Sequence, residues 1–202
     1  MVLLRVRLLI AAALLVLLSG CFISDEPLLT PENADYPIAH GSVFIKSSVL
    51  RAQTDYEPFD NAVVISRDYD NKVKREGGYY VHEETGANGV KNVSRGLMKQ
   101  IEKNAYLVMV QDKESGRYWY GLFEREGEEW VQYKVLCEDL VASAKRAGEP
   151  LENFGAVRTP SGACKFTSLE RLMHAIKFAR DLSPKARAWA RYKKPPARPP
   201  EG

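Results

Sequence analysis

The chain has 202 residues, enough for one ordinary globular domain with a core that needs no metal or disulfide to form. Hydrophobic residues make up 45% of the chain and charged residues 27%, values that exclude wholesale disorder. The net charge of +3 is concentrated in residues 182–202, which hold six basic residues against one acidic residue. Because residues 21–181 are mildly acidic, the composition does not indicate a nucleic-acid partner.

The N-terminal segment has the zones of a secretory signal. Arg5 and Arg7 give it a positively charged start, and residues 8–18 form an unbroken apolar run that two small residues follow. A membrane-spanning helix needs about 20 apolar residues, so this run is too short to cross a bilayer well. We expect residues 1–20 to direct export and then to be cleaved.

The end of this segment, Leu18-Ser19-Gly20-Cys21, resembles the lipobox of bacterial lipoproteins. The resemblance is limited to residues 1–21 and implies nothing about the domain that follows. It implies that a diacylglyceryl group is attached to the thiol of Cys21, that the chain is cut before this residue, and that the new amine receives a fatty acid such as palmitate. A cysteine thiolate is the nucleophile that such a thioether requires. Cys21 is therefore the predicted lipid attachment residue.

This resemblance also predicts the location of the protein. A lipidated Cys21 implies a periplasm-facing protein of the cell envelope, anchored on a membrane without crossing it. In enteric bacteria an aspartate after the lipidated cysteine suggests retention in the inner membrane. This chain has Phe22 there, which favours the outer membrane where the organism has one.

Residues 21–42 follow the predicted cleavage point. The segment contains three prolines separated by polar residues and is typical of a flexible linker. We predict a tether that lifts the domain off the bilayer.

The next part of the chain is rich in predicted strands. Short runs of β-branched and aromatic residues alternate with turn residues. The predicted strands are Val43–Leu50, Asn61–Arg67, Gly78–Glu83, Ala105–Gln111, Arg117–Arg125 and Glu129–Leu136. This spacing predicts an α+β domain over residues 43–182, with an antiparallel β-meander or small barrel of about six strands followed by two helices.

Two helices are predicted after the strands. Residues 137–147 carry one apolar stripe and end before Gly148. Residues 168–181 follow a capping-box pattern, with apolar residues spaced three and four apart.

Residues 183–202 are predicted to be a basic, proline-rich tail that begins with a short helix. Its basic residues are candidates for contact with anionic lipid or a cell-wall polymer, the alternative being a solvated terminus. The candidates are Lys185, Arg187, Arg191, Lys193 and Lys194.

Two cysteines remain once Cys21 carries lipid. Cys137 and Cys164 are candidates for a disulfide, because an exported chain meets an oxidising compartment; two buried thiols are the alternative. A structural zinc needs four ligands, and His174 is the one histidine near the pair in sequence. We predict no metal and no cofactor.

The chain contains no nucleophile, phosphate-binding or redox motif that defines an active site. His82 begins a pattern resembling HExxH, but Gly86 stands where the second histidine is needed. The acidic stretch 68–71 resembles a calcium loop that lacks its glycine and final glutamate, so we expect a hairpin turn. No catalytic residue is predicted.

The sequence therefore favours a lipid-anchored envelope protein with a non-catalytic binding or structural role. One alternative is an envelope hydrolase with a site near His82 or His174. A second is an envelope assembly or adhesion factor. The sequence does not identify a protein partner.

Overall fold

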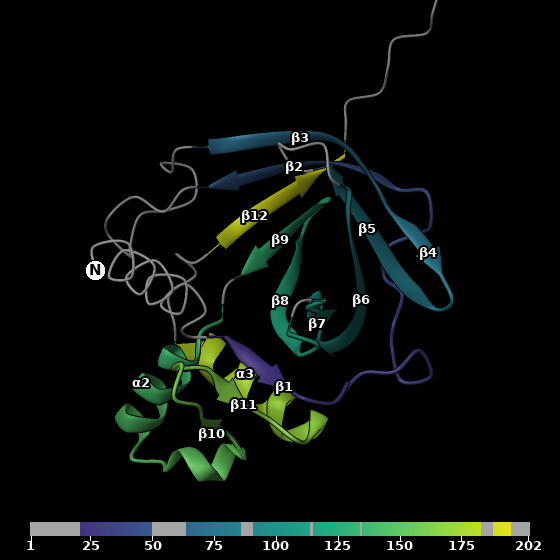
Figure 1. The fold of residues 1–202 in the computed structure, drawn as a ribbon. Coiled ribbons are helices and arrows are strands. Elements are labelled where there is room, and N and C mark those ends of the chain that lie inside the picture. Colours follow the sequence, from purple (N-terminus) through teal and green to yellow (C-terminus); the bar gives the residue numbers. More distant parts are fainter. Residues whose placement is uncertain are drawn as a thin grey trace, which may run out of the picture.

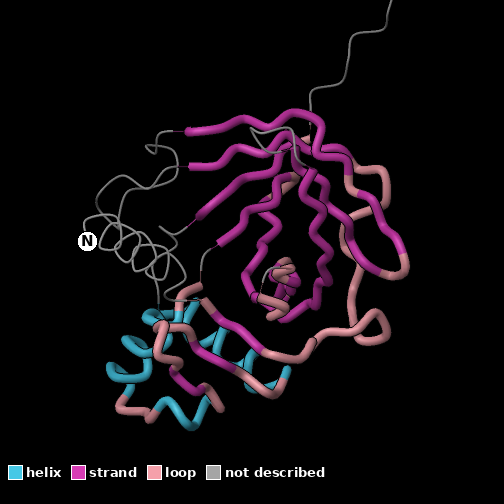
Figure 2. The backbone as a smooth tube through the Cα atoms, in the orientation of Figure 1, coloured by secondary structure: helices cyan, strands magenta, loops and turns pink. Residues whose placement is uncertain are grey.

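The computed structural model describes residues 21–49, 64–85, 91–113, 115–133, 135–182 and 188–194, and the fold is given for these residues. It has the predicted α+β class, with a largely antiparallel sheet and two helices in the C-terminal half (Figures 1 and 2). The strands are β1 (Phe22–Ser24), β2 (Val43–Val49), β3 (Val64–Lys72), β4 (Lys74–Glu76), β5 (Tyr79–Thr85), β6 (Lys91–Glu102), β7 (Ala105–Gln111), β8 (Tyr118–Glu126), β9 (Glu129–Tyr133), β10 (Val157–Arg158), β11 (Cys164–Lys165) and β12 (Ala188–Lys193). The helices are α2 (Cys137–Ala147) and α3 (Leu169–Leu182), with a 3₁₀ turn, η2, at Leu151–Phe154.

The main sheet is an open path of paired strands in the order β3-β2-β12-β9-β8-β7-β6-β5-β4. The alternative of a small closed barrel is wrong, because no ladder joins the two ends of this path among the described residues. The number of about six strands was also too low. Only Val73 separates β3 from β4, although they stand at opposite ends of the path, and the sheet is accordingly strongly curved (Figure 1).

The hairpins from β7 to β9 form from local signals. Alternate residues of β7, which are Ala105, Leu107 and Met109, are buried, as expected for a strand with one face on the core. A turn with Asn104 at a φ of 65° joins β6 to β7, and Gly127 at 62° lies in the turn between β8 and β9.

Strand β6 was missed because its apolar residues do not alternate cleanly. Leu97 and Ile101, four residues apart, face the main core, while Met98 packs on the other side of the sheet. Gly96 is needed here because a Cβ would lie 2.9 Å from the carbonyl oxygen of Met109 on β7. The predicted turn at 68–71 is also wrong, since these residues lie within β3.

Both predicted helices are confirmed. In α2, the side chain of Asp139 accepts a hydrogen bond from the Leu136 N–H at 3.0 Å, and Gly148 ends the helix in the left-handed region. Helix α3 begins one residue later than predicted, after Ser168, whose carbonyl oxygen accepts the N–H of Leu172.

Two apolar clusters lie on opposite faces of the sheet. The larger joins one face to α2 and α3, with fully buried Leu107, Leu140, Leu172 and Ile176 among its members. The smaller surrounds Met98 and Trp130 on the other face. Two aromatic residues of β8 follow this division, since Tyr120 joins the larger cluster and Phe123 the smaller one. They are core residues in both cases.

The predicted tail is only partly a tail. Residues 188–193 form β12, which pairs antiparallel with β2 on one side and β9 on the other (Figure 1). They are therefore a strand and not part of the predicted short helix. Within this strand Ala190 is fully buried and Tyr192 joins the smaller cluster. Period-two alternation and the two strand edges available on β2 and β9 outweigh the helix propensity of Ala and Arg.

Candidate functional site

The predicted lipid attachment residue adjoins the folded body directly. The carbonyl oxygen of Cys21 accepts a hydrogen bond from the N–H of Cys164 at 3.0 Å, and that of Ile23 accepts the Phe166 N–H at 2.9 Å. Phe22 is fully buried and packs edge-on against Phe166, with ring centroids 5.2 Å apart. The flexible tether predicted over residues 21–42 is therefore wrong at its start, because β1 is inserted between β8 and β11.

The residues after β1 are fixed by a buried polar contact. The hydroxyls of Ser24 and Tyr120 lie 2.7 Å apart, and the Tyr120 hydroxyl also accepts the Leu28 N–H at 3.1 Å. Burial raises the pKa of Tyr120 above its usual value, so its hydroxyl stays protonated. Leu29 is fully buried in the larger cluster, which extends the docked segment well past β1.

The disulfide candidate is bridged. Cys137 and Cys164 are joined, with Cα atoms 5.1 Å apart and a sequence separation of 27. Cys137 opens α2, and Cys164 lies on β11 beside Phe22. The bridge thus ties the segment that pairs with β1 to the first turn of α2.

A group of charged side chains lies beside β1. Asp25 forms ion pairs with Lys165 of β11 and, at 3.8 Å, with Arg117 just before β8. The hydrogen bond from Lys165 lowers the pKa of Asp25, although burial opposes the effect. Sequence reasoning missed this group because the three residues are far apart in the chain. The β-prone run at Phe22–Ser24 was the signal that could have indicated it.

The basic residues proposed to contact an anionic surface are divided by the fold. Arg191 on β12 lies 3.3 Å from both Glu126 and Glu129, and Lys193 lies 2.8 Å from Glu129. Partial burial alone raises the pKa of Glu129, but hydrogen bonds from Lys193 and Arg191 outweigh it and lower that pKa. These two cations are therefore engaged in holding β12.

The remaining three members of that set differ in status. Lys194 is exposed at the end of β12. Lys185 and Arg187 lie outside the described residues.

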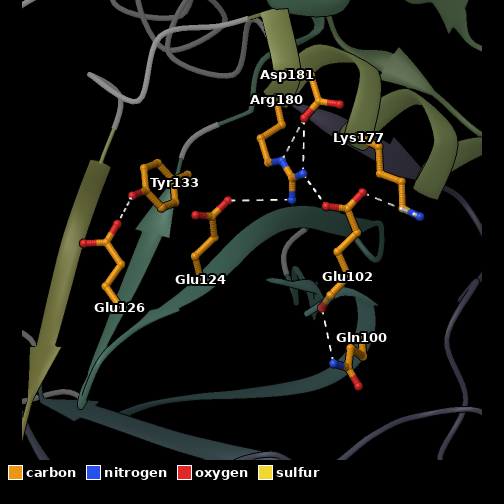
Figure 3. A network of polar contacts seen from close by, with 8 residues as sticks. All are labelled: Gln100, Glu102, Glu124, Glu126, Tyr133, Lys177, Arg180 and Asp181. Carbon is orange, nitrogen blue, oxygen red and sulfur yellow. Dashed lines mark hydrogen bonds and ion pairs between the residues drawn. The ribbon is translucent and has the colours of Figure 1, made fainter. Parts of the chain in front are cut away.

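A second polar network joins α3 to the sheet (Figure 3). Arg180 forms ion pairs with Glu102 at the end of β6, with Glu124 of β8 at 3.9 Å, and with its neighbour Asp181 at 3.2 Å. The hydrogen bond from Arg180 lowers the pKa of Glu102. This arrangement fastens the C-terminal end of α3 across the sheet.

Figure 3 also shows Tyr133 beside this network. Its hydroxyl donates to the carboxylate of Glu126 at 2.5 Å. Burial and this hydrogen bond to a carboxylate raise the pKa of Tyr133, so the phenol remains a donor at every physiological pH.

The histidines considered for catalysis lie on different elements, β5 and α3. His174 on α3 is exposed and stacks on Phe154, with ring centroids 5.3 Å apart. His82 lies on β5, and its side chain is outside the described residues. The third histidine, His40, accepts the Arg75 N–H through Nδ1 at 3.1 Å. Across the described ranges, no three His, Cys, Asp or Glu side chains gather as metal ligands.

Comparisons with protein-family models, curated proteins and solved structures give no match for this chain. In the part of the chain that the structure describes, no helix has the length and apolar character needed to span a bilayer. The described residues thus define an α+β domain with a disulfide, whose first described strand starts at Phe22.

Proposed function

We propose that this protein is a lipid-anchored lipoprotein of the bacterial cell envelope, with Cys21 as its lipidated first residue. The observation that carries the proposal is the order of a charged start, an eleven-residue apolar run and the lipobox-like stretch Leu18-Ser19-Gly20-Cys21. Two or three acyl chains hold a protein firmly, since each buried methylene contributes about 0.8 kcal/mol.

The disulfide supports an exported protein. Disulfides persist in oxidising compartments such as the periplasm and are rare in the cytosol. The bridge between Cys137 and Cys164 therefore agrees with the compartment that the leader implies. Phe22, in place of an aspartate after the attachment residue, favours the outer membrane over the inner one.

We further propose that the domain has a binding or structural role and is not an enzyme. The charged side chains that gather in the structure, around Arg180 and Arg191, form ion pairs between secondary-structure elements. Groups used in this way stabilise the packing of α3 and β12. Crosslinking in intact envelopes, followed by identification of the captured protein, is the experiment that names a partner.

Lipid attachment is tested by growing cells that express the protein with a labelled fatty acid. We expect the label in the wild-type chain and in Ser19→Ala, which keeps a small residue before the cleavage point. Cys21→Ser should incorporate no label and should leave the membrane fraction. Unlabelled wild-type protein, or a Cys21→Ser variant that stays membrane-bound, contradicts the proposal.

A further inference from the structure

No flexible segment separates the lipid attachment residue from the folded domain. Phe22 is fully buried, and β1 is hydrogen-bonded between β8 and β11 from its first residue. The Cys21 carbonyl oxygen is itself bonded to the Cys164 N–H at 3.0 Å. A lipid on the Cys21 sulfur is therefore only about one side chain's length from the folded backbone, and the body cannot move away from the bilayer.

Strand register identifies the side chains that share the face of the Cys21 thiol. Side chains alternate along a strand, so Cys21 and Ile23 point to the same face. Ile23 stands opposite Trp119 on β8 and opposite Lys165 on β11, and Lys165 stands opposite Val157 on β10. Residues paired directly across strands share a face. This set defines one face across β8, β1, β11 and β10, on which Ile23 is buried, with 5% of its surface exposed, and Trp119 is half-buried.

The ion pairs of Asp25 confirm this arrangement. Asp25 lies just after β1 and Arg117 just before β8; an extended continuation of the two strands would place both on this face. Asp25 does form ion pairs with Arg117 and Lys165. We call the solvent-accessible part of this face, made by Cys21, Asp25, Arg117, Val157 and Lys165, the anchor face.

The composition of the anchor face suits the interfacial region of a bilayer. Val157 is 67% exposed and is the large hydrophobic residue that stands out in solvent among those described. Arg117 and Lys165 outnumber Asp25, so the face carries a net positive charge. An exposed apolar side chain beside basic residues is a combination that suits contact with lipid headgroups. The opposite face is core, since Phe22 and Cys164 are fully buried there.

We propose that the anchor face lies directly on the bilayer and contacts anionic phospholipid headgroups, so that the domain has a fixed orientation on the membrane. This inference rests on the proposed lipidation of Cys21. Beyond lipidation, it specifies which face of the domain contacts the membrane, which headgroup charge that face binds, and which side of the domain faces away from the bilayer. Bilayer lipid is the partner favoured here because the lipid attachment is part of the same face and because the net charges are complementary.

The orientation is tested with a spin label on the mature, lipidated protein in vesicles of phosphatidylglycerol and phosphatidylcholine. The label is attached at Val157→Cys and, as the matched exposed control, at Glu76→Cys, on β4 at the far side of the domain (Figure 1). Because Cys21 is then lipidated and Cys137 is bridged to Cys164, the introduced thiol is the one that reacts. Accessibility to dissolved oxygen and to a water-soluble nickel chelate is measured at both positions.

We expect the ratio of oxygen to nickel accessibility to be several-fold higher at position 157 than at position 76. Equal, water-like ratios in protein that has incorporated labelled fatty acid overturn the inference and leave the proposed function intact. A label at 157 shielded from both reagents indicates a protein cover, such as a second copy, and also overturns it. Failure to incorporate fatty acid overturns the proposed function itself, and the inference with it.

The charge of the partner is tested by neutralising the two cations. In the Val157→Cys background, Arg117→Gln together with Lys165→Gln should lower the oxygen-to-nickel ratio in vesicles with phosphatidylglycerol, and much less in pure phosphatidylcholine. Lys99→Gln together with Arg75→Gln removes the same charge elsewhere and should leave the ratio unchanged. An equal response in both variants, or none in either, contradicts an anionic partner at the anchor face.

Discussion

Strands β1 and β12 come from opposite ends of the described chain, and both were expected to lie outside the fold. Each joins the sheet by pairing on both sides. The stabilising contacts differ. In β1 the three residues are all buried and the main anchor is Phe22, whereas β12 has Ala190 in the core but relies on ion pairs from Arg191 and Lys193. The comparison shows that one sheet can fix its terminal strands by two different forces, which respond differently to mutation, reduction and pH.

The largest loss of stability is expected from a substitution in β1, which apolar burial holds in the sheet. Phe22→Ala should lower the free energy of unfolding by about 3–5 kcal/mol, because it removes a fully buried aromatic side chain and leaves a cavity against Phe166. Urea denaturation of the mature protein in detergent measures it. Val157→Ala, at an exposed position, should cost less than about 0.5 kcal/mol. Similar small losses at both positions would show that β1 is not docked in solution.

Loss of the disulfide should have the next largest effect. Replacing Cys137 and Cys164 together by alanine should cost about 3.5 kcal/mol, because the bridge closes a loop across 27 positions in the unfolded chain. The melting temperature of this variant should not respond to reductant, while that of the wild type should fall toward it. If reductant present during thermal unfolding leaves the melting temperature of the wild type unchanged, this result argues against the bridge.

Removing the ion pairs that hold β12 should cause a smaller loss of stability. Arg191→Met should lower the free energy of unfolding by about 2 kcal/mol, since it leaves the carboxylates of Glu126 and Glu129 without this cation. Hydrogen exchange should show faster exchange at the β12 amides and little change at β1. Lys194→Met, at an exposed position, is the matched control and should change neither. Uniform acceleration across the sheet would mean that β12 has no separate stability.

The smallest effect is a difference in acid sensitivity. The pKa of Glu129 is lowered from its ordinary value of 4.5, so its contribution is fully present above that value and is lost as the pH falls through the folded-state pKa. The free energy of unfolding should therefore decline less steeply below about pH 4.5 in Glu129→Gln than in the wild type, with a difference of less than about 1 kcal/mol. The cost of Phe22→Ala should stay the same from pH 7 to pH 4, since its contacts carry no charge. An unchanged acid slope in Glu129→Gln would assign the effect to other carboxylates.

Local signals account for the parts of the fold that the sequence predicted well. The bounds of β7 agree at both ends, and those of α2 do as well, because strand alternation, a capping carboxylate and Gly148 act within a few residues. The pairing of Cys137 with Cys164 followed from the export signal and the number of cysteines. Strand β6 was missed because its role depends on neighbours that supply an apolar face on each side.

By itself, the sequence determined the leader pattern, the identity of Cys21 as the candidate attachment residue, the α+β class and both helices. All of these depend on residues that are neighbours in the chain. Only the tertiary structure decided that Phe22 belongs to the core, that residues 188–193 are a strand and that Asp25, Arg117 and Lys165 meet beside Cys21. These outcomes depend on strand edges and burial that are supplied from far away in sequence. A short terminal segment becomes a strand when the rest of the fold offers it an unpaired edge and an apolar place for its side chains.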